Sequence, residues 1–420
     1  MPFVGSFIPP GDKSVSHRLI LMALLAEGET VIKGLSDGED VASSLKAFRA
    51  LGGEAKPEGE NGLRIKGLAG HWPYFDGLEI DCGNSGTTMR LLSGILAGSK
   101  GRYILDGDDQ LRRRPMERVA KPLRLMGARV DCHNGRPPLT IEGSSLNGIN
   151  FSPADASAQV KGAVLLAGLL AHSPTTVTEI SPTRAHTERL INYFHGQVTI
   201  EGLKLTVSPG ILRLPPTFNT PGDPSSAAYF LTAAAIIPDS KVMAKNILLS
   251  TGRIGFLKVL SRMGAQVSIT LTSDTPEPIG DVSVAYSGPL TGAEVLAPEI
   301  PTLIDEIPML ALAATQAHGE TIFRQVDELR VKETDRLMSI RHQLGALGGR
   351  MSVEGDDLFI KGPTSFILPE KLDSGRDHRL AMTLKMALYA AKAQIPILGT
   401  ESIAISYPNF EEHLNLLWRN

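Results

Sequence analysis

The chain is poor in cysteine, with only Cys82 and Cys132 among 420 residues. Two cysteines cannot make a disulfide framework, and we expect both to be free thiols, as in a reducing cytosol. The sequence has no HExxH, no paired CxxC and no GxGxxG after a strand-like run. The segment GSFIPPGDKS has the wrong spacing for a phosphate-binding P-loop. The common metal and nucleotide motifs are therefore excluded.

Long hydrophobic runs are also missing. The apolar stretches are shorter than the about 20 residues that span a bilayer. The start of the chain, MPFVGSFIPPGDK, lacks the basic segment and apolar core of a signal peptide. The net charge of −3 gives no reason to expect nucleic acid or an anionic membrane as a partner. We expect a cytoplasmic protein with neither nucleic acid nor a membrane as its partner.

The chain does contain one helix pattern that occurs six times. Each copy opens with polar residues and continues into a small, almost uncharged apolar stretch. The copies begin at Gly11, Gly83, Asp155, Gly222, Ile304 and Asp377. A spacing of about 70 residues indicates one repeated supersecondary unit.

A second, more amphipathic pattern follows each copy. It ends in Gly, the residue that most readily caps a helix, and then enters a strand-like run. These segments begin at Lys46, Lys121, Glu188, Lys258 and Arg341, with a last one at Phe410 that the chain end cuts short. Each unit is therefore predicted to contain a buried helix, a strand, a surface helix and two strands.

Two segments rich in Pro and Gly divide the repeats into two groups of three. They are residues 9–11 and residues 213–226, and such compositions suit linkers. We predict a first lobe over residues 12–221 and a second lobe over residues 222–420 together with residues 1–11. The N-terminal strand would then pair with the second half, and a cleft between hinged lobes would suit a ligand.

Basic residues gather in the polar turns of the repeat, beside small residues such as Ser14, Gly86 and Ser157. Helix N-termini carry partial positive charge, so turns of this kind favour a small, multiply anionic ligand. The fourth copy has no basic residue at its start and is expected to be mainly structural. A plainer interpretation stays open, in which these are solvated side chains beside ordinary helix caps. The basic residues are Lys13, Arg18, Arg90, Arg112, Arg113, Arg114, Lys161, Arg184, Arg330, Lys332, Arg336, Arg376 and Arg379.

Two segments offer groups for proton transfer. In ELRVKETDRL, which begins at Glu328, a helix would place Lys332 and Arg336 on one face, with Glu333 beside them. Asp305 opens the fifth buried helix among apolar neighbours, where it could act as an acid or base. Alternatively, Asp305 is a plain N-cap and the charged run is a solvated helix face.

Taken together, these motifs resemble the EPSP synthase (3-phosphoshikimate 1-carboxyvinyltransferase) family over essentially the whole chain, and in particular its divergent class II branch. The resemblance implies an α/β (α+β) fold of two lobes, each with three βαβαββ repeats around buried parallel helices. The motifs are GDKSVSHR at Gly11, GNSGTTMR at Gly83, RRPMERV at Arg113, SAQVK at Ser157, PGDPSSAA at Pro221, LIDEIPMLA at Leu303, ELRVKETDRL at Glu328 and DHRLAM at Asp377.

The resemblance also implies a reaction. The enolpyruvyl group of phosphoenolpyruvate moves to the 5-hydroxyl of shikimate 3-phosphate, and phosphate is released. This step belongs to chorismate and aromatic amino acid biosynthesis, uses no metal or organic cofactor, and is the target of glyphosate. A monomer is expected.

The site residues that the resemblance implies fall into three sets. The catalytic residues would be Asp305, Lys332 and Glu333. Shikimate 3-phosphate would contact Lys13, Ser14, Arg18, Ser157, Ala158, Gln159, Arg184, Asp305 and Lys332. Phosphoenolpyruvate would contact Lys13, Gly86, Arg114, Gln159, Arg336 and Arg379.

The chain departs from many members at two positions. Ala158 stands where many have a second Ser, and Ile405 where many have a Lys that contacts phosphoenolpyruvate. Gly86 is retained, so glyphosate is expected to inhibit. One alternative is UDP-N-acetylglucosamine 1-carboxyvinyltransferase, although its usual Cys acid is absent near Asp109. The other is a non-catalytic anion-binding repeat protein.

Overall fold

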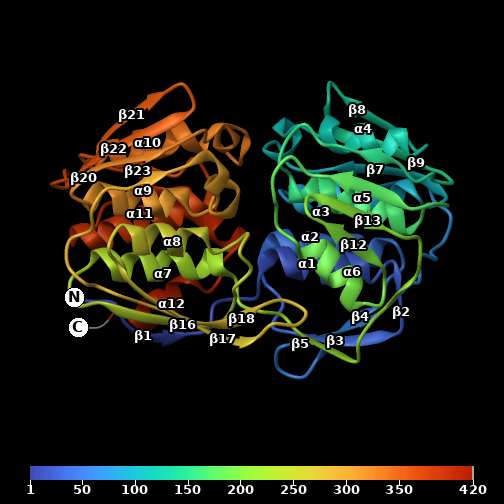
Figure 1. Cartoon of the computed structure of the whole chain (residues 1–420), viewed down its shortest axis with the longest axis horizontal. Helices are drawn as coiled ribbons and strands as arrows, with labels where there is room; N and C mark the ends of the chain where they lie inside the picture. Colours follow the sequence, from blue (N-terminus) through green and yellow to red (C-terminus); the bar gives the residue numbers. More distant parts are fainter. Residues whose placement is uncertain (419–420) are drawn as a thin grey trace. The chain divides into compact units, whose positions relative to one another are not determined.

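The computed structural model describes residues 1–418. In this part of the chain, inner and outer helices alternate along the sequence (Figure 1). The inner helices are α1 (Lys13–Met22), α3 (Gly86–Ala97), α5 (Ala158–Leu169), α7 (Pro224–Ile236), α9 (Ile307–Gln316) and α11 (His378–Ala391). The outer helices are α2 (Glu39–Ala50), α4 (Glu117–Leu125), α6 (His186–Tyr193), α8 (Gly255–Arg262), α10 (Arg336–Ala346) and α12 (Phe410–Leu417). The predicted alternation of a buried helix and a surface helix in each repeat is confirmed.

The inner helices are buried on nearly all sides because their sequences are apolar all round. In α7, every residue from Pro224 to Ala235 is buried. Five of the six begin at a side chain that accepts a first-turn N–H: Asp12, Ser85, Ser157, Asp223 or Asp377. Such caps satisfy the donors that a helix start leaves without partners.

The strands form five four-stranded sheets of identical order within residues 1–418. The first strand runs parallel to the second, and the remaining pairs are antiparallel. Three sheets lie within residues 11–220, in the spatial orders β15 (Thr217–Asn219), β3 (Glu29–Lys33), β5 (Gly62–Lys66), β4 (Ala55–Glu58); β6 (Asp76–Asp81), β7 (Gly101–Asp106), β9 (Arg136–Gly143), β8 (Arg129–His133); and β10 (Asn150–Phe151), β11 (Thr175–Thr178), β13 (Lys204–Val207), β12 (Val198–Glu201). The other two sheets have the orders β1 (Val4–Phe7), β16 (Lys241–Leu248), β18 (Ile279–Ala285), β17 (Gln266–Ser273); and β19 (Glu294–Val295), β20 (Gly319–Phe323), β22 (Asp357–Gly362), β21 (Arg350–Glu354). The short pairs are β2 (Ala26–Glu27) with β14 (Leu212–Arg213) and β23 (Leu372–Asp373) with β24 (Ile397–Leu398).

The chain forms two compact units. The N-terminal unit is residues 11–220, and the C-terminal unit is residues 1–10 with 221–420; the sequence prediction placed these boundaries one residue later. The predicted pairing of the N-terminal strand with the second half is confirmed, because β1 pairs with β16. The N-terminal unit is completed in the same way by β15, which pairs with β3. Each unit therefore borrows the first strand of its first repeat from a distant segment.

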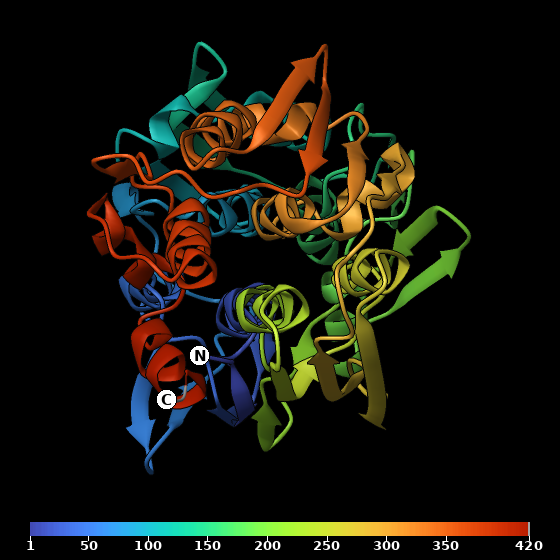
Figure 2. The same cartoon turned by 90° about the vertical axis from the view of Figure 1, so that its left-hand side faces the viewer.

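In the C-terminal unit, α7, α9 and α11 pack on one another, and Figure 2 views them almost end-on. An aromatic group is part of this core, in which Phe230 of α7 contacts Phe3, Phe7 and Phe410. In the N-terminal unit, α3 and α5 approach closely at Gly94. A Cβ there would lie 2.1 Å from the backbone oxygen of Ala163.

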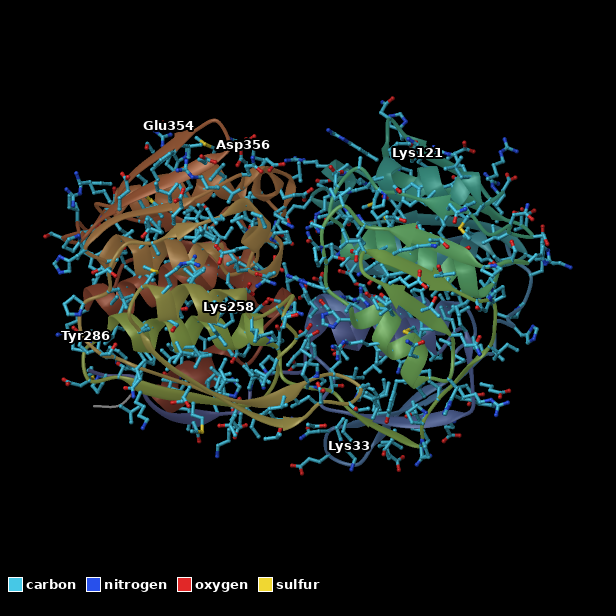
Figure 3. The ribbon with its side chains drawn as sticks, in the orientation of Figure 1. Lys33, Lys121, Lys258, Tyr286, Glu354 and Asp356 are labelled. Atoms are coloured by element: carbon cyan, nitrogen blue, oxygen red, sulfur yellow. The ribbon has the colours of Figure 1, made fainter. Side chains whose placement is uncertain are left out.

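Charged side chains cover the outer layer. Lys121 on α4 and Lys258 on α8 are exposed, as are Glu354 and Asp356 at the turn between β21 and β22 (Figure 3). Across residues 1–418, no helix combines the length and apolar character needed to cross a membrane.

Candidate active site

The first helix start of the N-terminal unit presents a fixed ammonium group. Asp12 accepts a hydrogen bond from the backbone N–H of Val15 and so begins α1. Lys13 then pairs with Asp40 of α2, with 2.8 Å between Nζ and Oδ2, and its side chain keeps 16% of its surface exposed. Asp40 therefore orients a cation that still reaches solvent. Asp40 was not predicted from the sequence, because it lies outside the repeated turns.

Arg18 lies one turn further along α1 and is held by two oxygens. Its Nε donates to Thr187 Oγ1 of α6 at 2.8 Å, and its Nη1 donates to the backbone oxygen of Ser14 at 2.8 Å. The side chain is almost fully buried. Arg184 precedes the same helix and is half-buried. The start of α6 thus connects two of the predicted phosphate ligands.

The starts of α3 and α5 form a second group in this unit. Gln159 donates to Thr87 Oγ1 at 2.8 Å and accepts a hydrogen bond from Arg90. Arg114 donates to Asn84 Oδ1 at 2.7 Å. A Cβ on Gly86 would lie 2.9 Å from Arg90 Nη1 and 3.1 Å from Arg114 Nη1. Gly86 therefore leaves the space in which these two guanidinium groups meet.

Ser157 and Ala158 lie directly beside this group. The Ser157 hydroxyl accepts from the backbone N–H of Val160 and caps α5, and Ala158 is the first residue of that helix. The backbone N–H groups of a helix start favour an anion. The structure thus brings the consecutive residues Ser157, Ala158 and Gln159 to the same group as Gly86 and Arg114.

In the C-terminal unit, Asp305 lies between two guanidinium groups. Its Oδ1 is 3.6 Å from Arg336 Nη1 and 3.5 Å from Arg379 Nε. Asp305 precedes α9 and does not cap it, since the N-cap position is Glu306, whose side chain makes no capping bond. The two alternatives for Asp305 thus resolve against a plain N-cap.

Arg336 is completely buried and is held by carboxylates. Asp377 accepts from its Nε at 2.9 Å and from its Nη2 at 3.3 Å, and Glu333 accepts from the same Nη2. Burial alone would lower the pKa of Arg336, but Asp377 and Glu333 outweigh it and raise that pKa. Asp377 also accepts from the backbone N–H groups of Arg379 and Leu380. Asp377 therefore holds the guanidinium of Arg336 and the backbone of Arg379, whose own guanidinium lies beside Asp305.

The prediction that Lys332 and Arg336 share a helix face is wrong. A short 3-10 helix, η3 (Asp327–Val331), ends before Lys332, and α10 begins only at Arg336, after the N-cap Asp335. Lys332 and Glu333 lie in the bend between them. Burial lowers the pKa of Lys332, and the nearby Asp305 carboxylate opposes that shift. The bend turns Glu333 back toward Arg336.

Several basic residues in the repeated turns do not join these groups. Lys161 is buried in α5 and pairs with Glu179 and Glu188. Arg112 and Arg376 are exposed and pair with Asp106 and Glu401.

The fourth repeat has no basic residue at its helix start, as the sequence shows, but a cation from elsewhere in the repeat lies there. Arg253, from the loop before α8, donates to Asp223 Oδ1 at 2.8 Å and to Ser225 Oγ at 3.1 Å. Sequence reasoning missed it because it lies about 30 residues beyond the helix start. Asp377 begins the DHRLAM motif, but only its contact with Arg336 in the structure reveals its importance.

Similarity to known proteins extends over nearly the whole chain. The family described as EPSP synthase (3-phosphoshikimate 1-carboxyvinyltransferase) matches residues 2–414. The 3-phosphoshikimate 1-carboxyvinyltransferase of Synechococcus sp. (strain JA-3-3Ab) is 44% identical over 412 residues, which are 97% of this chain and 92% of that protein. The protein of the same name from Geobacillus kaustophilus is 42% identical over 418 residues, with 98% and 97% coverage.

Solved structures agree with this similarity. EPSP synthase from Acinetobacter baumannii superposes with a TM-score of 0.86 at 38% identity, covering 99% of this chain and 96% of that one. The enolpyruvyl transferase NikO from Streptomyces tendae shares the fold, with a TM-score of 0.79 at 18% identity over 99% and 95% of the two chains. The predicted fold class is thereby confirmed. This chain belongs to the EPSP synthase family of enolpyruvyl transferases.

Proposed function

We propose that this chain transfers the enolpyruvyl group of phosphoenolpyruvate to the 5-hydroxyl of shikimate 3-phosphate, giving 5-enolpyruvylshikimate 3-phosphate and phosphate. The observation that carries this function is the family match over residues 2–414. The relatives named above support it over nearly their full length. UDP-N-acetylglucosamine transfer and non-catalytic anion binding are not favoured, since those relatives carry the shikimate name.

In this proposal the N-terminal unit mainly holds shikimate 3-phosphate. Lys13, Ser14 and Arg18 from α1, Ser157, Ala158 and Gln159 from the start of α5, and Arg184 before α6 would bind its phosphate, carboxylate and ring. The fixed contacts of Arg18 with Thr187 and Ser14 support this role, because an oriented guanidinium loses little freedom on binding an anion. Gly86 and Arg114 would contact phosphoenolpyruvate.

The C-terminal unit would supply the clamps and the proton-transfer groups. Arg336 and Arg379 are guanidinium groups that carboxylates hold in place, and fixed cations stabilise anionic oxygens well in a dry site. When an anion binds, it would compete with Glu333 and Asp305 for these cations. Both carboxylates would then gain freedom to act on substrate.

The proposed chemistry is an addition followed by an elimination. Glu333 donates a proton to the methylene carbon of phosphoenolpyruvate, and Asp305 takes the proton of the 5-hydroxyl as that oxygen attacks the adjacent carbon. In the elimination, the methyl group returns one proton to Glu333, and Asp305 gives its proton to the phosphate oxygen as the carbon–oxygen bond to phosphate breaks. Lys332 would touch both substrates, and burial lowers its pKa, which makes it a better proton donor.

Turnover tests the function directly. The full chain, given shikimate 3-phosphate and phosphoenolpyruvate, should release phosphate, seen by ³¹P NMR, in equal amount to a new enolpyruvyl ether, seen by the vinyl protons in ¹H NMR. Replacing shikimate 3-phosphate with UDP-N-acetylglucosamine should give no release. The proposal would be contradicted if phosphate were released only with the UDP sugar, or if neither acceptor led to its release.

Asp305→Asn tests the proposed base. The amide keeps the shape but cannot accept the hydroxyl proton, so kcat should fall about 10²–10⁴-fold. Binding of shikimate 3-phosphate, measured by calorimetry, should remain measurable. A variant with the kcat of the parent protein would remove Asp305 from this role.

We infer a monomer in the cytoplasm with small-molecule substrates and no nucleic acid partner. The net charge of −3 supports small anionic ligands held by local cations rather than a long polyanion. Sedimentation of the purified chain tests the monomer.

A further inference from the structure

Lys161 is a buried ammonium group that neither proposed substrate set includes. It lies in the first turn of α5, two residues after Gln159, and its side chain is 1% exposed. Its Nζ lies 2.7 Å from Glu188 Oε1 and 3.1 Å from Glu179 Oε2. Both carboxylates are themselves buried. Burying three charges is costly, so this triad indicates a requirement other than stability alone.

The triad fastens both ends of one segment. Glu179 directly follows β11, and Glu188 is the third residue of α6. Between them runs the loop 180–185, in which Thr183 donates to Glu179. Lys161 therefore holds residues 179–188 against α5, the helix that Ser157 caps. The loop cannot move away from α5 without exposing or separating these charges.

The pinned segment carries the groups that serve the proposed phosphate site. Arg184 lies in the loop itself, and Thr187 accepts the hydrogen bond of Arg18. Gly162, the residue after Lys161, allows this approach, since a Cβ there would lie 2.8 Å from Thr187 Oγ1. The triad thus fixes the loop that carries Arg184 and the residue Thr187 that orients Arg18.

We propose that the Lys161–Glu179–Glu188 triad is a positioning device for the phosphate end of the shikimate 3-phosphate site. It acts by holding residues 179–188 so that Arg184 and Arg18 converge on one anion. The inference rests on the proposed function. It predicts that a substitution in the triad weakens the binding of shikimate 3-phosphate and leaves the binding of phosphoenolpyruvate nearly unchanged.

Glu179→Gln is the main test, because it keeps the side-chain shape and leaves the Lys161–Glu188 pair. Loss of one charge-assisted contact should raise the KM for shikimate 3-phosphate about tenfold. The KM for phosphoenolpyruvate should change less than about twofold, within the scatter of remote substitutions. Hydrogen exchange of the free protein should show faster exchange in residues 180–190 and no change in β6–β9.

Glu58→Gln is the matched control. Glu58 of β4 forms an exposed pair with Arg64 in the same unit, with 2.8 Å between the charged atoms. It should leave both KM values and the exchange of residues 180–190 unchanged. Lys161→Met should exceed Glu179→Gln in effect, and Lys161→Arg should recover part of the affinity because it restores the cation. If Lys161→Met does not fold, the Glu179→Gln result still decides.

The outcomes separate the two proposals. If the parent chain shows no turnover of shikimate 3-phosphate, the proposed function fails. If it turns over but Glu179→Gln keeps the parental KM for shikimate 3-phosphate, the positioning role is overturned while the function stands. A fall in kcat with both KM values unchanged would indicate only a smaller folded fraction, and would also overturn it.

Discussion

At the scale of single residues, Asp377 links two tasks that are usually separate. Its carboxylate caps α11 and also holds the guanidinium of Arg336. A cap needs only an acceptor oxygen, whereas a buried guanidinium needs a negative charge beside it. The two tasks can therefore be separated by the choice of substitution.

We predict that Asp377→Asn keeps the helix start but loosens Arg336. The catalytic efficiency with phosphoenolpyruvate should fall about tenfold or more, since one charge-assisted pair is lost. Steady-state kinetics with either substrate varied would measure this. Asp335→Asn, at the exposed cap of α10, should leave the kinetics unaltered. Equal effects of the two substitutions would argue against the special role of Asp377.

A second prediction concerns Gly86. The added methyl group of Gly86→Ala would crowd the guanidinium groups of Arg90 and Arg114. Because Arg114 is a proposed phosphoenolpyruvate contact, the KM for phosphoenolpyruvate should rise, and glyphosate should inhibit about tenfold less well. Gly345→Ala in α10 is a control, since a Cβ there meets no atom within 4 Å. Unchanged inhibition by glyphosate in Gly86→Ala would refute the assignment of this space.

The roles of these residues came from motifs, not from their local patterns. Position along the repeat indicated that helix starts gather charge. It could not reveal that Asp40, Thr187 and Asp377 orient the predicted ligands, because each acts on a partner 27 to 169 positions away.

At the scale of elements, the helix pattern was predictable because burial on every side demands an apolar, uncharged sequence. The failure at ELRVKETDRL has the opposite cause. Its spacing suits a continuous helix, but the chain bends at Lys332–Thr334 so that Arg336 is buried against Asp377. The partner that enforces the bend lies 41 residues further on. Local propensity therefore loses to a tertiary ion pair.

The inner helices α1 and α3 and the outer helix α2 are connected through His17 of α1 and two hydroxyl groups. His17 Nδ1 lies 2.8 Å from Ser44 Oγ of α2, which lies 2.8 Å from Thr88 Oγ1 of α3. Burial lowers the pKa of His17 from 6.5 to about 3, aided by Lys13 and Arg18 and opposed by Asp40. The folded state thus holds a neutral imidazole.

This gives a pH prediction. Because the folded pKa lies below the unfolded one, the contribution of His17 is complete above about pH 6.5 and is lost as the pH falls toward 3. Urea unfolding at pH 7 and pH 5 should therefore show a larger loss of stability in the parent chain than in His17→Gln. His195→Gln, at an exposed histidine, should lose as much stability between pH 7 and pH 5 as the parent chain. Parallel losses in all three proteins would contradict a neutral buried His17.

At the scale of the whole molecule, the chain organisation was predictable in outline. Two Pro- and Gly-rich segments marked the crossings, and the apolar N-terminal run indicated a strand for the second half. The return strand β15 was not foreseen. It has only three residues and follows Pro215 and Pro216, so its sequence is typical of a linker.

The N-terminal strand should matter strongly for stability. Phe7 of β1 is 4% exposed and packs edge-on against Phe230. Phe7→Ala should therefore destabilise the C-terminal unit by about 3–5 kcal/mol. Denaturant unfolding would measure this, with Tyr74→Ala, at a side chain 71% exposed, as the control. A loss below about 1 kcal/mol, the typical cost of a point substitution, would mean that β1 adds little to its sheet.

The borrowed strand β1 also has a consequence for biosynthesis. It is translated before the N-terminal unit, yet the backbone N–H of Phe3, just before β1, donates to Ser240 Oγ, 237 residues later. The whole N-terminal unit is translated while β1 has no sheet to join, so that unit can finish folding as an insertion before its host begins. Phe3 also forms an antiparallel β-bridge with Trp418. A circular permutant of these 420 residues that begins at residue 221, with a linker between residues 420 and 1, would make both units continuous in sequence and remove this delay.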